Sequence, residues 1–325
     1  MINKKKKICV VGAGNWGINH IRTLNSLGSL GGIVESNLNQ MNLLKKEYSH
    51  IELFADLDMA IKVGFDGFIV ATPAKTHYNI SKKIIKSKHH ILIEKPITNN
   101  LKDAIRLVEL AKINNVNLMV GHLLLFHPAF IQIKKMIKDG ELGEIQYLYS
   151  NRLNFGTVRD CENVFWSFAP HDISLFQFLI DSNPNNVESN GNDVLREGIH
   201  DTTITTIEYP GKVMGHIFVS WLHPFKEHRF VVIGSKGMLH FEDSMMGKPL
   251  IFYDKKVEFN KNIPVLKEKP SKTINYNSKL PLEEELKYFI DHLDGTPIKI
   301  ANGESAIEVM EILDIATYKL LRNKL

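Results

Sequence analysis

The stretch that decides the fold is ICVVGAGNWG, residues 8–17. A short apolar run, residues 8–11, leads into glycines at positions 12, 14 and 17. The run predicts a buried strand, and the residues beyond it predict a helix. In such a strand–turn–helix the first glycine permits the tight turn, the second lets a pyrophosphate approach the backbone, and the third lets the helix pack closely on the strand. The motif therefore predicts a dinucleotide-binding domain that holds phosphate at a helix N-terminus. The residues that it assigns to the cofactor are Gly12, Gly14, Asn15, Trp16 and Gly17.

The lysines at residues 4–7 offer a different interpretation, the basic start of a signal peptide. A signal peptide needs an apolar region of roughly 7–15 residues. The run at residues 8–11 is much shorter and leads into glycine and asparagine. We therefore expect the lysines simply to precede the first strand.

Glu35 follows a second apolar run, about twenty residues beyond the last glycine of the motif. A carboxylate at this place binds the hydroxyls of the adenosine ribose and repels the 2′-phosphate of NADP. The sequence therefore predicts NAD as the cofactor.

Apolar runs and amphipathic segments alternate through residues 1–120. The runs are KICVVG, LGGIVES, DGFIVAT, HILIEKP and VNLMVGH, and the amphipathic segments cover residues 16–27, 37–48, 75–88 and 100–114. Continuous apolar runs are typical of strands buried on both faces of a parallel sheet, and their alternation with helices gives a doubly wound α/β fold. We expect an NAD-binding Rossmann domain over residues 1–123.

The strands expected after residue 123 are longer and alternate between apolar and polar residues, as in EIQYLYSNRL, TTITTIEYP and KVMGHIFVSWL. This alternation is typical of an antiparallel sheet with one covered face. Helices are expected at residues 128–138, near 170–180, and at about 282–293 and 303–322, with a polar, solvated excursion at 255–280. Residues 124–325 are thus predicted to form a second domain for substrate binding and oligomerisation, whose last helix packs back on the first domain.

The composition narrows the class of partner. The net charge is +4, and the lysines are scattered rather than gathered in a basic block with interleaved aromatics, which argues against nucleic acid. The longest apolar stretch, VNLMVGHLLLFHPAFI, is interrupted by glycine, histidine and proline, so no membrane span is expected. Two distant cysteines, Cys9 and Cys161, suit the reducing cytoplasm better than a disulfide framework.

Two polar segments, ATPAKTH at residues 71–77 and EKP at 94–96, follow the predicted fourth and fifth strands. Both are expected at the carboxyl edge of the sheet, where open α/β folds bind ligands. Lys95 there can donate to a reacting oxygen or exchange a proton with it. A strand-end lysine taken alone is more often a surface charge, so these segments by themselves leave both interpretations open.

Together with GHLLLFHPAF and FWSFAPHDIS, these motifs resemble in order and spacing the glucose–fructose oxidoreductase / inositol dehydrogenase / MocA (Gfo/Idh/MocA) family, over essentially the whole chain. The resemblance implies an N-terminal Rossmann domain, a C-terminal α/β domain with a large, mainly antiparallel open sheet, and bound NAD(P). It matches Lys95 to the family's catalytic lysine and His171 to the histidine at the start of a second-domain helix. It also implies cofactor contacts from Thr72, Pro73, His77, Glu94 and Lys95.

One position departs from the family pattern. Many members carry an aspartate four residues before the histidine, where one helical turn makes the two residues face each other. Here that residue is Ser167. Asp172 follows His171 directly, but adjacent helical residues do not face each other. We therefore expect Lys95 to carry more of the proton transfer, with His171 assisting.

Arg152, Asn154 and Trp166 flank the presumed site, and together with His171 they are predicted to bind the substrate. Guanidinium and aromatic groups suit a pyrophosphate or a uridine, although Trp166 could equally belong to the core. The other histidines show no spacing typical of a metal site, so no metal is expected.

The segments SNRLNFG, ENVFWSFAPHDIS and HIFVSWLHPFKEHRFVVIGSKG resemble family members of surface-polysaccharide and lipid-A amino-sugar pathways. This resemblance implies an NAD-dependent oxidoreductase that oxidises a secondary hydroxyl, at C3, of a nucleotide-activated amino sugar such as UDP-N-acetylglucosamine or its uronic acid. The alternatives are a free polyol, inositol or aldose dehydrogenase, and a catalytically silent NAD-binding regulator on the same fold. The resemblance further implies a homodimer or homotetramer.

Overall fold

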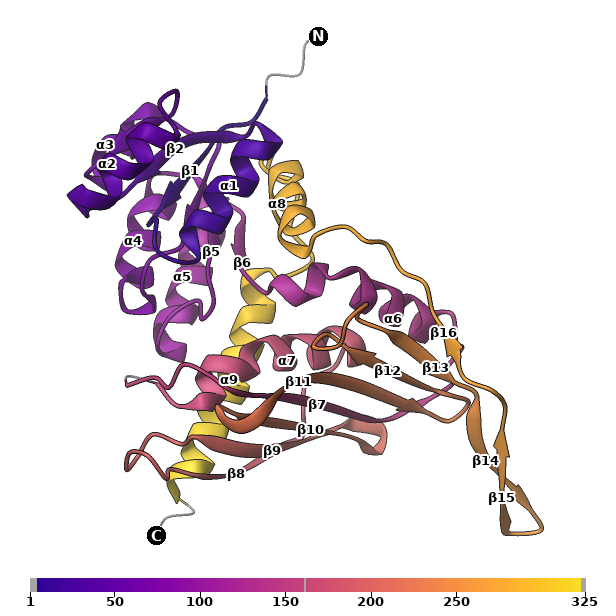
Figure 1. Cartoon of the computed structure of the whole chain (residues 1–325). Helices are drawn as coiled ribbons and strands as arrows, with labels where there is room; N and C mark the ends of the chain where they lie inside the picture. The colour runs from indigo at the N-terminus through magenta and orange to yellow at the C-terminus, as the bar shows by residue number, and fades with distance from the viewer. Residues whose placement is uncertain (1–4, 161, 323–325) are drawn as a thin grey trace. The chain divides into compact units, whose positions relative to one another are not determined.

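The computed structural model describes residues 5–160 and 162–322 of the chain (Figure 1). These residues divide into two compact units. The first comprises the described residues up to Phe126 together with Leu280–Met310, and the second comprises His127–Lys279 together with the described residues from Glu311 onward. Each unit has its own sheet.

Within the described residues, the first unit is built on a six-stranded sheet in the order β3-β2-β1-β4-β5-β6. All neighbouring strands are parallel. The strands are β1 Ile8–Val11, β2 Leu30–Val34, β3 Glu52–Phe54, β4 Gly67–Val70, β5 His90–Ile93 and β6 Leu118–Val120. The strand order reverses between β1 and β4, which is the switch point where doubly wound sheets bind ligands. The predicted Rossmann fold is confirmed.

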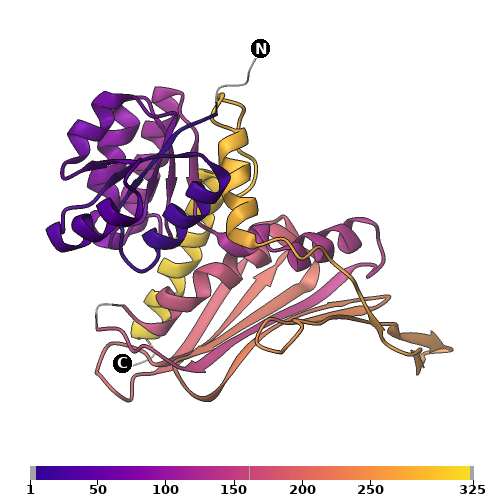
Figure 2. The ribbon, with the colours of Figure 1, turned by 45° about the horizontal axis from the view of Figure 1, so that its top comes forward.

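Helices connect these strands and cover both faces of the sheet (Figure 2). They are α1 Gly17–Leu27, α2 Leu38–Glu47, α3 Leu57–Val63, α4 Ala74–Lys86 and α5 Leu101–Asn114. Because helices lie on both faces, every residue of β1 and β4 is buried, and this explains their continuous apolar runs. β3 and α3 have no counterpart among the predicted elements, since β3 is only three residues long and partly exposed.

Residues 280–310 belong to the first unit, although the sequence pattern placed them in the second domain. The reason is the packing of α8 (Pro281–Asp291), whose Phe289 is buried close to the backbone of Gly67 in β4. The side-chain amide of Asn117 also donates to two carbonyl oxygens of the segment that follows α8. The first boundary falls at Phe126, after the short helix η1 (Leu123–Phe126) and close to the expected residue 123. Helix α9 (Gly303–Arg322) begins in the first unit and ends in the second.

The second unit contains, among its described residues, an eight-stranded sheet in the order β16-β13-β12-β11-β7-β10-β9-β8. Strands β7 (Ile145–Phe155) and β10 (Val213–Ser220) are parallel neighbours, and the other pairs are antiparallel. The remaining strands are β8 Asn186–Asn192, β9 Thr202–Tyr209, β11 Leu222–Gly234, β12 Met238–Glu242, β13 Leu250–Tyr253 and β16 Lys272–Thr273. The predicted large, mainly antiparallel sheet is confirmed.

Helices α6 (Pro128–Lys138) and α7 (Val164–Ile180) lie over one face of this sheet, and no helix of the described part of the unit covers the other face (Figure 2). Phe130 of α6 and Phe176 of α7 both contact Phe230 of β11 in T-shaped geometry. The covered face forms the core of the unit, and this one-sided burial explains the apolar–polar alternation of its strands.

Residues 255–280, predicted to be a polar, solvated excursion, contain a β-hairpin. Strands β14 (Lys255–Asn260) and β15 (Ile263–Glu268) pair in antiparallel register, and the hairpin projects beyond the large sheet of its unit (Figure 1). Almost every residue of the hairpin is exposed. The sequence pattern therefore lacks the buried face by which strands are normally recognised.

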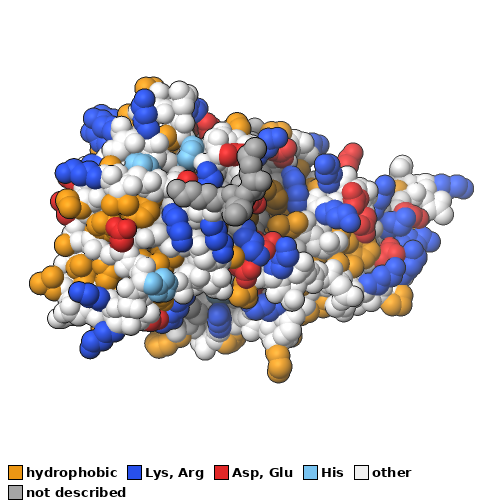
Figure 3. All heavy atoms as spheres, turned by 90° about the horizontal axis from the view of Figure 1, so that it is seen from above, with side chains coloured by type: hydrophobic (Ala, Val, Ile, Leu, Met, Phe, Trp, Pro, Cys, Tyr) orange, Lys and Arg blue, Asp and Glu red, His pale blue; other side chains and the backbone are white. Residues whose placement is uncertain are grey.

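None of the described helices is long and apolar enough to cross a membrane. On the face shown in Figure 3, lysine and arginine side chains are interspersed with acidic and uncharged ones.

Candidate active site

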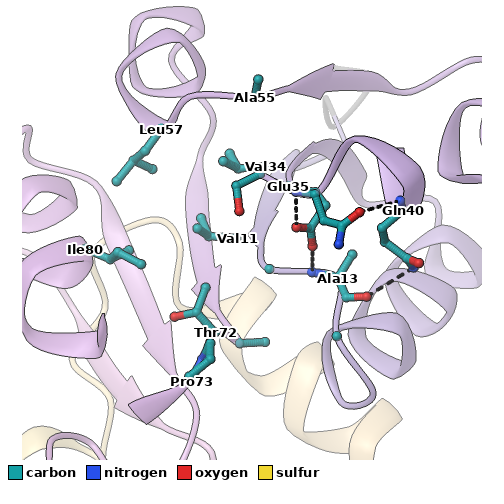
Figure 4. Close-up of a pocket in the computed structure, with 15 residues that line it drawn as sticks. Val11, Ala13, Val34, Glu35, Gln40, Ala55, Leu57, Thr72, Pro73 and Ile80 are labelled. Carbon is teal, nitrogen blue, oxygen red and sulfur yellow. Dashed lines mark hydrogen bonds between the residues drawn. The ribbon is translucent and has the colours of Figure 1, made fainter. Parts of the chain in front are cut away.

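A pocket opens at the carboxyl ends of β1, β2 and β4 (Figure 4). It encloses about 480 Å³, within the range of roughly 300–1,000 Å³ that is typical of small-molecule sites. Five residues predicted to bind the cofactor line it, namely Gly12, Gly14, Glu35, Thr72 and Pro73. The fold thus brings residues that are far apart in the sequence into one cavity at the switch point of the sheet.

The three glycines of the motif have different backbone environments. Gly12 has a φ of +94°, which favours glycine, and a Cβ on Gly17 would lie only 2.1 Å from the carbonyl oxygen of Gly12. Helix α1 therefore starts directly against the turn. Around Gly14 no described atom lies within 4 Å of the place of a Cβ, so the backbone there is open to the pocket. Gly12 therefore fits the role of the tight turn, Gly17 that of close helix packing, and Gly14 that of close approach by a pyrophosphate.

Two backbone N–H groups fix the carboxylate of Glu35 at the pocket. Ala13 N donates to Oε2 at 2.8 Å, and Asn37 N donates to Oε1 at 2.8 Å. Gln40 completes the turn by donating its amide to the carbonyl oxygen of Ala13 at 3.2 Å (Figure 4). Each carboxylate oxygen can accept more than one hydrogen bond, so Glu35 can also accept bonds from two ribose hydroxyls.

The lining fits a dinucleotide. The open backbone at Gly14 leaves room for a pyrophosphate, and the first turn of α1 carries no acidic residue that would repel it. Glu35 supplies acceptors for the adenosine ribose. A 2′-phosphate would bring its negative charge against this carboxylate, which favours NAD over NADP.

The other residues predicted to bind the cofactor lie outside the lining of this pocket: Asn15, Trp16, Gly17, His77, Glu94 and Lys95. His77 is buried behind the lining of the pocket. Its Nε2 lies 2.8 Å from the carbonyl oxygen of Thr72, and its Nδ1 lies 2.9 Å from that of Pro96. His77 thereby joins the loop after β4 to the loop after β5. The second loop contains the cis peptide bond between Lys95 and Pro96.

The side chain of Glu94 is buried and bonded to the start of α1. Its Oε1 accepts the indole N–H of Trp16 and lies 2.7 Å from Nε2 of His20, and its Oε2 accepts the backbone N–H of Lys95 at 3.1 Å. A Cβ on Gly121 would lie 2.9 Å from Oε2, so the glycine makes room for the carboxylate. Glu94 therefore connects the start of α1 to the backbone of Lys95.

His20 was not among the predicted residues. Its signal in the sequence is its place four residues after Trp16, one helical turn away, where side chains share a face.

His122, just beyond β6, is a buried neighbour of the same group. Burial lowers the pKa of its imidazole to about 4; the positive charge of Lys95 lowers it too, and Glu94 acts in the opposite direction. The ring is therefore neutral at physiological pH and adds no second positive charge beside Lys95.

In the second unit, Arg152 of β7 is bonded to Asp172 of α7. Arg152 Nε donates to Oδ2 and Nη2 donates to Oδ1, both at 2.9 Å, and Ser150 Oγ donates to Oδ1 at 2.6 Å. Burial acts to lower the pKa of Arg152, but the Asp172 carboxylate raises it, and the net shift is upward. The guanidinium stays charged, and part of its fork is engaged by Asp172.

His171 is half-buried on α7, directly before Asp172, and its carbonyl oxygen accepts the hydroxyl of Ser174 at 2.8 Å. Ser167 is buried one helical turn earlier. Asp172, which the sequence pattern set aside because it cannot face His171, binds Arg152 instead.

The two remaining predicted substrate residues differ in what they still offer. Asn154 follows Arg152 by two positions on β7, and its side-chain oxygen is buried without a hydrogen-bond partner among the described residues. The indole N–H of Trp166 donates to Thr317 Oγ1 of α9 at 2.8 Å. Trp166 is thus tied into the packing of the second unit, whereas Asn154 retains an acceptor.

Two family profiles match the chain. Residues 6–122 match the NAD-binding Rossmann fold of the Gfo/Idh/MocA oxidoreductases, and residues 130–240 match the Gfo/Idh/MocA C-terminal domain. The chain belongs to the Gfo/Idh/MocA oxidoreductase family. It is accordingly an NAD-dependent oxidoreductase, and NAD is the dinucleotide that the pocket beside Glu35 fits.

Relatives within the Gfo/Idh/MocA family include sugar and polyol dehydrogenases. The UDP-N-acetylglucosamine 3-dehydrogenase of Acidithiobacillus ferrooxidans is 26% identical over 183 residues, which is 56% of each chain. The scyllo-inositol 2-dehydrogenase (NAD(+)) of Bacillus subtilis is 27% identical over 187 residues, 54% of this chain and 55% of that one. A solved structure of the Acidithiobacillus enzyme has a TM-score of 0.84 to this chain at 19% identity and covers 97% of both. The two chains therefore share their fold over nearly their whole length.

Proposed function

We propose that this protein is an NAD-dependent 3-dehydrogenase of a nucleotide-activated amino sugar, such as UDP-N-acetylglucosamine or its uronic acid. The observation that carries the proposal is the likeness to the Acidithiobacillus UDP-N-acetylglucosamine 3-dehydrogenase, in sequence over half of the chain and in fold over nearly all of it. The pocket at Glu35, with its carboxylate held by two backbone donors, supports the cofactor half of the proposal.

Oxidation of a secondary hydroxyl removes a hydride and a proton from the sugar. NAD, when bound, accepts the hydride at C4 of its nicotinamide ring. The chain itself must receive the proton and stabilise the oxygen that loses it. Lys95 is the residue proposed for this step, either as an ammonium that stabilises the developing alkoxide or as a neutral amine that takes the proton. Its backbone N–H is held by Glu94, which fixes the start of the side chain.

His171 is assigned an assisting role, on the strength of the family resemblance. The residue one helical turn before it is a hydroxyl rather than a carboxylate, so position 167 supplies no negative charge to stabilise an imidazolium. We therefore assign Lys95 the larger share of the proton transfer.

Arg152 and Asn154 are the proposed substrate-binding residues of β7. A guanidinium carries five N–H donors, and Asp172 accepts from two of its nitrogens, so Arg152 retains donors for a phosphate or hydroxyl oxygen. The buried side-chain oxygen of Asn154 suits a hydroxyl donor. Trp166 can offer the face of its ring but not its N–H, which Thr317 accepts.

A free polyol or inositol dehydrogenase is the second candidate, favoured by the likeness to the scyllo-inositol 2-dehydrogenase. The two candidates differ in whether the substrate carries a diphosphate.

We further propose a homodimer or homotetramer. The uncovered face of the large sheet carries Ile204 and Met214, which are 50% and 42% exposed, near the stacked rings of Tyr149 and His216. Apolar side chains gathered on an uncovered face are typical of protein–protein contacts. Light scattering after size exclusion should show a dimer or tetramer, and a monomer would contradict this part of the proposal.

The reaction is tested by following NADH formation by the purified protein with UDP-N-acetylglucosamine, its uronic acid and myo-inositol. We expect turnover of a UDP-amino sugar. A preference for inositol would support the second candidate, and NAD binding without any turnover would support the regulator.

Lys95→Met tests the proton step in the same assay. General acid–base help is typically about 10²–10⁴-fold, so kcat should fall at least about a hundredfold while NAD affinity is kept. Lys75→Met is the matched control, because Lys75 is exposed at the start of α4, on the same edge of the sheet. More than a tenth of kcat remaining in Lys95→Met would refute the role of Lys95.

A further inference from the structure

Glu94 does not line the NAD pocket, although the family resemblance implied a contact with the cofactor. Its side chain is buried, and a buried carboxylate is unfavourable unless hydrogen-bond donors surround it. Among the described residues, the donors are the indole N–H of Trp16, Nε2 of His20 and the backbone N–H of Lys95. The carboxylate therefore bonds to groups of the protein itself.

The two oxygens of this carboxylate serve different segments. Oε1 accepts the indole N–H of Trp16 and lies 2.7 Å from Nε2 of His20, so it binds the start of α1. Oε2 accepts the backbone N–H of Lys95 at 3.1 Å and so binds the loop after β5. Trp16 stands within the glycine motif, between Gly14 and Gly17. One side chain thus holds the cofactor turn on one side and the backbone of Lys95 on the other.

Gly121, directly after β6, leaves the space that the carboxylate occupies. Its backbone N–H donates to the carbonyl oxygen of Ile93 at 2.8 Å, which fixes it beside the end of β5. A Cβ on Gly121 would lie 2.9 Å from Oε2 of Glu94 and 3.0 Å from Oε1. Any side chain at this position would therefore push the carboxylate away from the place where it reaches both segments.

Only a group that accepts on both of its oxygens can serve both segments. The indole N–H of Trp16 and the backbone N–H of Lys95 can donate but not accept. His20 is adaptable, because its Nδ1 is buried with no hydrogen-bond partner in the described part of the chain and can carry the proton in place of Nε2. An amide instead of the carboxylate would point its N–H donors toward either Trp16 or Lys95, and that residue would lose its acceptor.

We propose that Glu94 is a positioning residue whose carboxylate holds the start of α1 and the loop of Lys95 in fixed places relative to each other. NAD binding and the placement of Lys95 are coupled through it, because Trp16 belongs to the turn that the pyrophosphate approaches. The part of the proposal that concerns NAD binding is independent of the sugar oxidised. The part that concerns proton transfer by Lys95 rests on the proposed function.

Three variants test whether Glu94 acts through its hydrogen bonds. Glu94→Gln keeps the shape of the side chain but supplies an acceptor to one segment only. Trp16→Phe removes the indole donor. In the double variant Trp16→Phe/Glu94→Gln, the amide can accept from Lys95 and donate to His20, so neither is left unpaired.

Two further variants complete the set. Gly121→Ala displaces the carboxylate without removing its charge, and it therefore separates the position of Glu94 from its charge. Glu109→Gln is the matched control for the loss of a carboxylate, because Glu109 is exposed on α5 of the same unit.

NAD affinity is measured by calorimetry. In Glu94→Gln the start of α1 is held in its binding arrangement in only a fraction of the molecules, and the apparent affinity falls by that fraction. One unpaired buried donor should weaken NAD binding about tenfold. Gly121→Ala should weaken it similarly, and Glu109→Gln should leave it unchanged. Adding Glu94→Gln to Trp16→Phe should change the affinity by no more than about twofold.

The indole N–H signals of protein labelled with ¹⁵N-tryptophan report the hydrogen bond directly. The chain has three tryptophans, and loss of one signal in Trp16→Phe identifies that of Trp16. This signal should move in Glu94→Gln and in Gly121→Ala. The signals of Trp166 and Trp221 should stay in place, because their indole groups donate to residues of the second unit, Thr317 and Asp201.

Three results would overturn the proposal. The first is a Trp16 signal that Glu94→Gln leaves in place. The second is an equal loss of NAD affinity on Glu94→Gln with and without Trp16→Phe, since Glu94 would then not act through Trp16. The third is NAD binding by Gly121→Ala equal to that of the unchanged protein. If Glu94→Gln does not fold, Gly121→Ala and the double variant still decide.

Turnover tests the coupling to Lys95 separately. On the substrate that the panel identifies, Glu94→Gln should lower kcat about tenfold or more at saturating NAD, because Lys95 is misplaced. An unchanged kcat would overturn this coupling. NAD affinity and the indole signals need no sugar, so failure of the proposed function, seen as an inactive panel, is distinguishable from failure of this proposal.

Discussion

Replacing Gly14 with alanine should separate cofactor binding from folding. No described atom lies within 4 Å of the place of a Cβ on Gly14, and its φ is not in the left-handed region. The free energy of unfolding without NAD should therefore change by no more than about 0.5 kcal/mol. The new methyl group would instead occupy the space into which the pyrophosphate must come. Loss of that close approach should weaken NAD binding at least about tenfold.

The assay is thermal or denaturant unfolding with and without NAD. At a concentration a hundred times its dissociation constant, NAD stabilises the unchanged protein by about 2.7 kcal/mol. A tenfold weaker complex at the same concentration gains only about 1.4 kcal/mol.

Gly17→Ala is the contrasting variant. Its Cβ would lie 2.1 Å from the carbonyl oxygen of Gly12, a backbone atom that cannot easily move away. Overpacking of this kind costs about 1–3 kcal/mol, so Gly17→Ala should lose stability even without NAD. NAD stabilisation of Gly14→Ala equal to that of the unchanged protein would refute the assigned approach of the pyrophosphate.

Three further changes test other parts of the site. Because the Glu35 carboxylate can accept hydrogen bonds from ribose hydroxyls and would repel a 2′-phosphate, NAD should bind at least about tenfold more tightly than NADP. Glu35→Ser should narrow that difference in affinity, and equal affinities in the unchanged protein would contradict the assignment. Ser167→Asp should keep NAD binding and move the acid limb of the pH–rate profile for oxidation to higher pH, because a carboxylate one turn before His171 favours its imidazolium; an unmoved profile would show that His171 is not the titrating base. Burial lowers the pKa of His122 to about 4, while an unfolded histidine titrates near 6.5. The free energy of unfolding should therefore fall by about 3 kcal/mol as the pH is lowered from about 6.5 to about 4. His122→Asn should lack that loss, and parallel stability curves for the two proteins would rule it out.

The place of the pocket was predictable because its signals are local. The turn at Gly12 and the packing at Gly17 are properties of neighbouring residues. Glu35 follows an apolar run, and that run predicts the strand at whose end Glu35 lies. The sequence also predicted where Lys95 lies, because a residue that directly follows a parallel strand is at the carboxyl edge of the sheet.

The burial of Glu285 could not be predicted, because it depends on tertiary packing. Glu285 lies on α8, and nothing near it in the sequence shows that α8 belongs to the first unit. Its neighbours Glu283 and Glu284 are surface residues with the same side chain, and only burial distinguishes them. The hydrogen bond between Arg152 and Asp172 also depends on tertiary packing, because it joins a strand to a helix, and the sequence did not predict it.

The hairpin at residues 255–268 was missed for the opposite reason. Its strands are paired with each other but bury almost nothing. Strand recognition rests on a buried face, so an exposed hairpin has the pattern of a loop.

Oxidation at C3 of a nucleotide-activated amino sugar is tested most directly by tracing the hydrogen that leaves the sugar. UDP-N-acetylglucosamine, or its uronic acid, is prepared with deuterium at C3 and incubated with the protein and NAD, and the reduced cofactor is analysed by mass spectrometry. We expect NADH that carries one deuterium from the C3-labelled sugar and none from sugar labelled at C4. Unlabelled NADH from the C3-deuterated substrate, or no reduction of NAD by either UDP-sugar, would contradict it.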